Sequence, residues 1–175
     1  MKVSLSPVVP ADLKIAVDDV LISRLNTVTV GERLTLARRA SGRVAAALLL
    51  DQESGDGKTN KDAGSEENLN NTIKDARSEP PAVRVMRIAL ENPRLTETLI
   101  INAVLRPAAS VALIQAVASH QKWSVRKEIR AALLRTEHLS LARALEFSSE
   151  IPPPLRREIL ASSRLPEKIK AQLEP

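Results

Sequence analysis

Few residues in this chain have the types and spacing that catalysis or cofactor binding requires. Gly57-Lys58-Thr59 ends like a phosphate-binding loop, but that loop also needs a glycine five residues before Gly57, where this chain has Gln52. His120 and His138 have no second histidine four residues along, which is the spacing of a common zinc motif. We therefore expect no nucleotide site, no metal site and no cofactor.

Serines and carboxylates give no better case for catalysis. No serine lies in a Gly-x-Ser-x-Gly elbow, and Ser41, Ser124 and Ser140 stand where helices are expected to begin, which explains them as N-caps. Asp18 and Asp19 are adjacent, so on a helix their carboxylates point about 100° apart rather than toward one substrate. The sequence predicts a protein that is not an enzyme.

The basic residues are the one candidate set for contact with a partner. Arg126, Lys127 and Arg130 are spaced to share one side of a helix, and Arg156 and Arg157 are expected to extend the same patch from the next unit of the chain. A row of cations along a helical array can follow a phosphate backbone. This set predicts either an ordinary solvated face or, as a functional alternative, sequence-independent nucleic-acid binding.

Two features favour a protein partner over a nucleic acid. Glu128 and Glu158 lie within the basic set and reduce its charge. Trp123 is the one aromatic residue near the set that could stack on a base, and we expect its ring to fill the core at the start of a helix. The opposite, apolar side of that helix is predicted to consist of Val125, Ile129, Ala132 and Leu133.

Composition favours closely packed helices in one domain. The 175 residues are 43% hydrophobic, but they include one Trp, one Phe and no Tyr, so the core must be built from Leu, Ile, Val and Ala. No stretch alternates apolar and polar residues as a half-buried strand would. The absence of cysteine excludes disulfides and thiolate metal sites, and it fits a reducing compartment.

Neither a signal peptide nor a membrane span is expected. The first residues lack the apolar core of a signal peptide, and Pro7 and Pro10 would break a helix there. The longest run of Val, Ala and Leu, residues 44–50, is far shorter than the roughly 18 to 20 residues of a membrane span. We predict a soluble, cytoplasmic protein without a membrane partner.

Residues 51–78 differ from the rest of the chain in charge and apolar content. They include four basic and seven acidic residues, a net charge of −3, whereas the remainder carries +8. Only four of them are apolar, so the stretch cannot bury enough surface to offset the entropy of ordering it. The predicted organisation is therefore N-terminal helices in 1–50, a flexible acidic insertion in 51–78 and a helical repeat array in 79–175.

Helix starts can be predicted on both sides of the insertion. Thr29 and Glu32 have the spacing of a capping box, Ser41 can cap a central apolar helix, and Pro10 can open an earlier one. After the insertion we expect short helices at 82–91, 96–105, 108–119, 125–135, 140–147, 153–161 and 167–173. Helices of two or three turns are marginal alone and persist when they are packed, as in a stack of repeats.

A recurring phrase indicates such a stack. It consists of a short amphipathic helix, a polar or Pro-containing break, a Leu and a new helix start, and it occurs at 87–96, 130–140 and 158–166. A second alignment of the chain with itself matches residues 116–129 with residues 144–159. In this second register, Trp123 matches Ile151, and the pair Arg126-Lys127 matches Arg156-Arg157. Self-similar short helices indicate that each unit buries its apolar face against its neighbours.

Two segments carry a resemblance to a known family. The Asn92-Pro93-Arg94-Leu95-Thr96 break and the Trp123-Ser124-Val125-Arg126 helix start resemble bacterial HEAT-like repeats of the leucine-rich-repeat-variant kind, over roughly 82–173 and more faintly 34–50. The resemblance implies an all-α, right-handed superhelix of paired helices, a solenoid, to which the composition of 51–78 adds a disordered insertion. The expected function is a noncatalytic protein-binding scaffold or adaptor in a bacterial cytoplasm, or an assembly part with the insertion as a tether.

Overall fold

The computed structural model describes residues 11–51, 80–107 and 109–173, and within them it contains ten α-helices, one 3-10 helix and no strand. In chain order they are α1 (Ala11–Ser23), η1 (Leu25–Thr27), α2 (Val30–Arg39), α3 (Gly42–Leu50), α4 (Pro81–Leu90), α5 (Glu97–Val104), α6 (Val111–Ser119), α7 (Lys127–Leu133), α8 (Leu141–Ser149), α9 (Pro153–Ala161) and α10 (Glu167–Leu173). None of the described helices combines the length and the apolar character that crossing a lipid bilayer requires. The all-α fold class is confirmed for these residues. Residues 52–78 of the predicted insertion, with Gly57-Lys58-Thr59, lie outside them.

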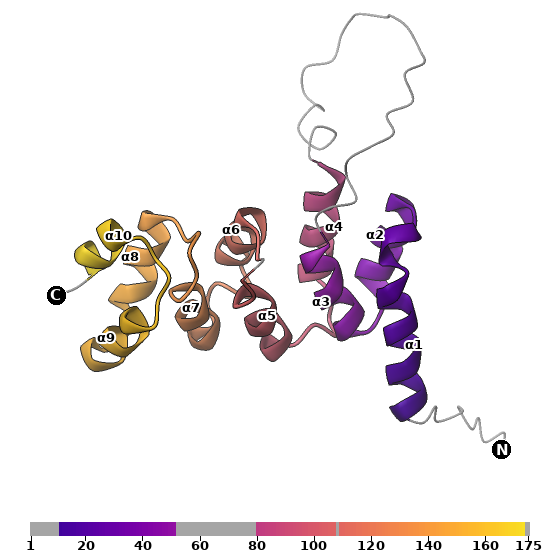
Figure 1. The fold of residues 1–175 in the computed structure, drawn as a ribbon, viewed down its shortest axis with the longest axis horizontal. Helices are drawn as coiled ribbons and strands as arrows, with labels where there is room; N and C mark the ends of the chain where they lie inside the picture. The colour runs from indigo at the N-terminus through magenta and orange to yellow at the C-terminus, as the bar shows by residue number, and fades with distance from the viewer. Residues whose placement is uncertain (1–10, 52–79, 108, 174–175) are drawn as a thin grey trace, which may run out of the picture.

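The helices lie in two rows. Figure 1 shows α1, α3, α5, α7 and α9 in the lower row and α2, α4, α6, α8 and α10 in the upper row. Contacts follow the rows, because α1 packs on α3, α3 on α5 and α5 on α7, while α2 packs on α4, α4 on α6 and α8 on α10. Contacts of α3 with α2 and α4, and of α6 with α7, join the two rows. From α1 to α7, and again for α8 and α10, helices two places apart in the chain therefore pack against each other.

Aliphatic side chains fill the space between the rows, as the composition predicts. Leu49, Ile100, Leu113, Ile129 and Phe147 come from different helices, α3, α5, α6, α7 and α8, and all five are fully buried. They belong to one continuous cluster of buried residues that runs along the molecule. The short helices are stable because this shared core buries the apolar side of each.

Side-chain caps fix the starts of α2 and α3 as predicted. Thr29 and Glu32 form the capping box: the Thr29 hydroxyl accepts a hydrogen bond from the Glu32 N–H, and the Glu32 carboxylate accepts one from the Thr29 N–H at 2.8 Å. Ser41 caps α3 and also donates to the Asp18 carboxylate at 2.6 Å, which ties α3 to α1. These caps bond helix N–H groups that have no partner within the helix.

The predicted N-cap position of Ser124 is wrong, and that of Ser140 is confirmed. Helix α7 begins at Lys127, so Ser124 lies in the break before it and offers its carbonyl to Arg130. Ser140 does precede α8, but its side chain makes no capping hydrogen bond. Tertiary contacts, rather than a local cap, position the starts of these two helices.

The breaks after α4 and α6 hold neighbouring units together. Asn92, after α4, is buried, and its Nδ2 donates to the carbonyls of Ala37 at 2.8 Å and Ala40 at 3.2 Å, at the end of α2. Trp123, after α6, is 2% exposed, and its Nε1 donates to the Leu90 carbonyl at 2.8 Å, at the end of α4. Both breaks therefore bond carbonyls at the C-terminal end of the preceding upper-row helix. The prediction that Trp123 fills the core is confirmed.

The recurring phrase at 87–96, 130–140 and 158–166 covers two different kinds of break between helices. Residues 87–96 join α4 to α5, from the upper row to the lower, whereas 130–140 and 158–166 lead from the lower row back to α8 and α10. The leucines that define the phrase, Leu95, Leu139 and Leu165, are nevertheless all buried. Both kinds of break need one apolar anchor between helices, so the sequence pattern does not distinguish them.

The second register is shifted. α6 begins at Val111 and α8 at Leu141, so Val117 corresponds to Phe147, and both are fully buried. The sequence register instead placed Val117 against Leu145, which is 43% exposed. In the helices that come next, Arg156 is the fourth residue of α9 and so corresponds to Arg130, the fourth residue of α7, rather than to Arg126.

Candidate interaction surfaces

Arg126 and Lys127 lie at the start of α7 and are exposed. Arg126 Nη1 is 4.0 Å from the Glu97 carboxylate of α5, and 54% of the Arg126 side chain is exposed. Val125 is 61% exposed and does not belong to the apolar side of the helix where the sequence pattern placed it, because α7 begins only at Lys127. The two cations face solvent, and their role in binding stays a prediction.

Arg130 points into the protein. Its guanidinium donates to the Ser124 carbonyl, pairs with the Glu150 carboxylate after α8 and lies 5.3 Å from the centre of the Phe147 ring. Only 11% of the Arg130 side chain is exposed. These contacts join α7 to its own preceding break and to α8, so Arg130 serves the packing of the fold.

Arg156 and Arg157 also differ from each other. Arg156 is half-buried, and its Nη1 donates to the Ser148 carbonyl of α8 at 3.4 Å, whereas Arg157 is exposed. The five predicted contact residues therefore do not make one exposed patch. Arg130 and Arg156 face inward, and Arg126, Lys127 and Arg157 face solvent.

A groove lies between α4 and α6, which are neighbours in the upper row of Figure 1. It encloses about 670 Å³. Its apolar lining consists of Val83 and Leu90 from α4 and Ala112 and Ala116 from α6, and its polar lining consists of Arg87, Glu91, Gln115, Ser119, His120 and Gln121. We call it the α4–α6 groove.

His120 lines the α4–α6 groove at the end of α6. Its Nδ1 accepts a hydrogen bond from the Lys122 N–H at 3.2 Å. Burial lowers the pKa of His120, and the nearby Glu91 carboxylate partly opposes that shift. The imidazole is therefore neutral at pH 7, and because Nδ1 accepts, its proton is on Nε2.

The second histidine, His138, is exposed in the break between α7 and α8. Among the residues that the structure describes, no three His, Cys, Asp or Glu side chains come together as the ligands of a metal ion would.

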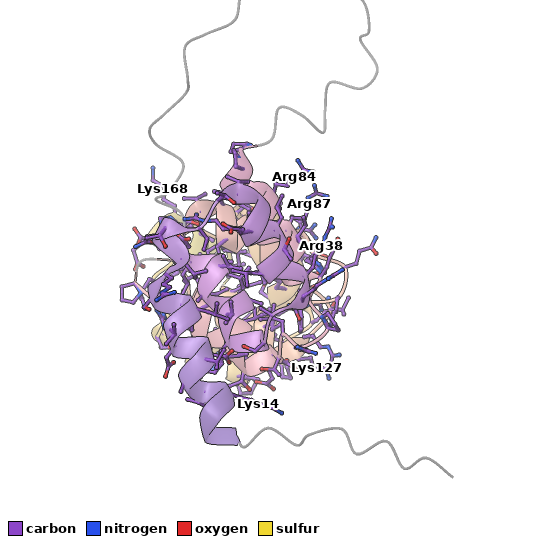
Figure 2. The ribbon with its side chains drawn as sticks, turned by 90° about the vertical axis from the view of Figure 1, so that its right-hand side faces the viewer. Lys14, Arg38, Arg84, Arg87, Lys127 and Lys168 are labelled. Atoms are coloured by element: carbon purple, nitrogen blue, oxygen red, sulfur yellow. The ribbon has the colours of Figure 1, made fainter. Side chains whose placement is uncertain are left out.

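A basic surface borders the α4–α6 groove. Arg84 and Arg87 are exposed one turn apart on α4, and Arg38 is exposed on α2, which packs against α4. Figure 2 shows Arg38, Arg84 and Arg87 on the same side of the molecule, with Lys168 on the opposite side. Within the described parts of the chain, the side chains of Arg38 and Arg84 make no hydrogen bond or ion pair. We call these three residues the α2–α4 basic surface.

The sequence predicts only part of the α4–α6 groove and of the α2–α4 basic surface. Val83, Arg87 and Leu90 recur at helical spacing, which is enough to place them on one side of a helix. The contact of α2 with α4 spans the predicted insertion, so local spacing does not bring Arg38 beside Arg84.

A second groove, of about 460 Å³, lies along the lower row, with α3 as its floor and α1, η1 and α5 as its walls. Two of its charged residues are already paired within the chain. Arg43 donates to the Asp19 carboxylate at 2.8 Å, and Asp51 lies 3.0 Å from the buried guanidinium of Arg33. Its charges thus hold α1, α2 and α3 together.

Comparison with known protein families, with curated proteins and with solved structures finds no match to this chain. The resemblance to HEAT-like repeats therefore stays a prediction.

Proposed function

We propose that this protein is a noncatalytic scaffold, a short solenoid of helical repeats that binds another protein in the α4–α6 groove. The observation that carries the proposal is the lining of this groove, in which an apolar floor is surrounded by polar side chains on the outside of the molecule. An apolar centre with a polar rim is the usual composition of a surface that binds a protein segment.

The solenoid part of the proposal rests on the packing of alternate helices. In stacked repeats, each helix contacts the equivalent helix of the next unit. The series α2–α4–α6 and α1–α3–α5–α7 have this pattern. The hydrogen bonds of Asn92 and Trp123 to the preceding upper-row helix support the same step from unit to unit. A right-handed, HEAT-like superhelix is the arrangement that we propose.

The α4–α6 groove also contains Ser119, His120 and Glu91, a set that invites comparison with a nucleophilic serine site. A serine nucleophile needs a base that accepts its proton. His120 Nδ1 already accepts the Lys122 N–H, which leaves the proton on Nε2, and within the described residues Ser119 makes no hydrogen bond to His120. This arrangement supports binding rather than catalysis.

The proposal is tested with a matched pair of substitutions. Ala116→Gln fills the groove, whereas Ala142→Gln places the same uncharged side chain on the exposed side of α8. Partners are captured from a nuclease-treated extract of the native cell after circular dichroism has shown equal helicity and melting. We expect a captured protein to be lost with Ala116→Gln and kept with Ala142→Gln. Capture that Ala116→Gln leaves unchanged contradicts the proposal, and Ser119→Gln at the rim replaces Ala116→Gln if that variant melts early.

Sequence-independent nucleic-acid binding is the alternative proposal. Its support is the exposed set Arg126, Lys127 and Arg157. A complex held by phosphate contacts weakens steeply between about 50 and 200 mM salt, whereas a largely apolar contact changes little. Loss of all captured material after nuclease treatment would favour this alternative.

A further inference from the structure

We infer that the partner segment bound in the α4–α6 groove is an acidic amphipathic helix. The inference rests on the proposed function and adds the chemistry of the ligand. Two observations carry it: the groove runs between two helices, and Arg87, which lines it, lies on the same side of the molecule as the exposed Arg38 and Arg84.

The shape of the groove suits a helix. On α4, Val83, Arg87 and Leu90 are four and three residues apart, so they follow one side of the helix for two turns. On α6, Ala112 and Ala116 are one turn apart. Between these two rows of side chains lies a straight channel about 10 Å long, which is the rise of a helix from Val83 to Leu90. The two small side chains of α6 let another helix approach closely.

An extended peptide suits the groove less well. Both walls are helices, whose backbone N–H and C=O groups are already bonded within each helix. A strand laid on the apolar floor would leave its own backbone groups without partners there. A helix bonds its backbone internally, so it can present apolar side chains at i, i+3 or i+4, and i+7 to Val83, Leu90 and Ala116.

The border of the groove favours acidic side chains on the incoming helix. Arg84 and Arg38 are exposed and make no side-chain hydrogen bond or ion pair in the described parts of the chain, and Arg87 lines the groove itself. Among the described residues that line the groove, Glu91 at the end of α4 supplies the carboxylate, whereas Arg38 and Arg84 are two exposed guanidinium groups without a described partner. Exposed ion pairs contribute little individually, but a basic border selects the sign of the partner's charge and its orientation in the groove.

Selection from a displayed peptide library tests the inference. The peptides have about 16 residues, an apolar stripe at helical spacing and polar positions randomised among Glu, Lys and Gln. They are selected on the full-length wild type, on Ala116→Gln and on the double variant Arg38→Glu/Arg84→Glu. The enriched peptides and a single-stranded oligonucleotide are then titrated by fluorescence anisotropy at about 0.15 M salt.

We expect enrichment of Glu beside the apolar stripe, loss of binding to Ala116→Gln and about tenfold weaker binding to Arg38→Glu/Arg84→Glu. The double variant Lys14→Glu/Lys168→Glu makes the same change in net charge on α1 and α10, outside the groove, and should bind the peptides as the wild type does.

Several outcomes overturn the inference. In the selection, they are enrichment of basic or uncharged helices, or no enrichment at all. In the titrations, they are equally weakened peptide binding in both double variants, or loss of oligonucleotide binding rather than peptide binding in Arg38→Glu/Arg84→Glu. If partner capture depends on Ala116 while the selected peptides are not acidic helices, the proposed function stands and this inference fails. If capture does not depend on Ala116, the proposed function fails as well.

Discussion

Arg84, Arg130 and Arg156 each occupy the fourth position of a short helix, yet one faces solvent and two face the protein. Arg84 lies on α4 in the upper row, and no described residue pairs with its side chain. Arg130 and Arg156 lie on α7 and α9 in the lower row and donate to backbone carbonyls of Ser124 and Ser148.

The difference between these arginines shows that the position within the helix does not by itself determine what a cation does. A lower-row helix comes after a break from the upper row, so its fourth residue can bond carbonyls of the break or of the preceding helix. Arg84 has no such neighbour among the described residues, whereas Arg33, the fourth residue of α2, donates to the Leu25 carbonyl and pairs with Asp51. Cations bonded in this way stabilise the fold, and exposed cations without such bonds are available to a partner.

The largest expected effect is that of Arg130→Ala, which should lower the free energy of unfolding by about 2 to 3 kcal/mol. The substitution leaves the Ser124 carbonyl without its donor and removes the contact with Phe147. The Glu150 side chain is 58% exposed and stays hydrated, so the loss is smaller than for a fully buried pair. Urea denaturation followed by circular dichroism measures it.

Arg84→Ala is the matched control, because Arg84 has the same position in its helix. It should change the free energy of unfolding by less than about 0.5 kcal/mol. Equal losses for Arg130→Ala and Arg84→Ala would contradict the distinction between these two arginines.

An intermediate effect is expected for Trp123→Phe, which sharpens the comparison because Trp123 lies in the break whose Ser124 carbonyl Arg130 binds. The substitution removes the hydrogen bond to the buried Leu90 carbonyl and should cost about 1 to 2 kcal/mol. Circular dichroism is the readout, since the chain has one Trp. Lys122→Ala removes the cation 4.2 Å above the Trp123 ring and should cost less than about 1 kcal/mol. A Phe variant as stable as the wild type would show that this bond does not hold the break.

The smallest expected effect is a dependence of stability on pH at His120, in the groove of the upper row. Burial lowers the pKa of His120 in the folded protein, so the unfolded chain takes up the proton first as the pH falls. The neutral ring therefore contributes stability above about pH 6.5, the ordinary pKa of histidine, and this contribution is lost as the pH falls through the lowered pKa of the folded protein. Melting temperatures of the wild type and His120→Gln across this range test it.

The exposed His138 supplies the control for the pH experiment. We expect His138→Gln to lose stability on acidification as much as the wild type does, and His120→Gln to lose less. Parallel curves for His120→Gln and the wild type would contradict the expected shift.

The sequence by itself determined the helical elements of this protein. The capping box of Thr29 and Glu32, the Ser41 cap and the helices Pro153–Ala161 and Glu167–Leu173 were all predictable, because caps and amphipathic spacing depend on residues three or four apart. The aliphatic composition likewise predicted the packing of helices without strands, and Trp123 was predicted to be buried.

Only the tertiary structure decided which basic residues face solvent. The partners of Arg130 include Glu150 from the next unit, and Arg38 lies beside Arg84 through the packing of α2 on α4. The α4–α6 groove also exists only where two separate helices meet. The sequence specifies which side of each helix is apolar, but which helices become neighbours depends on how all the apolar sides are buried together.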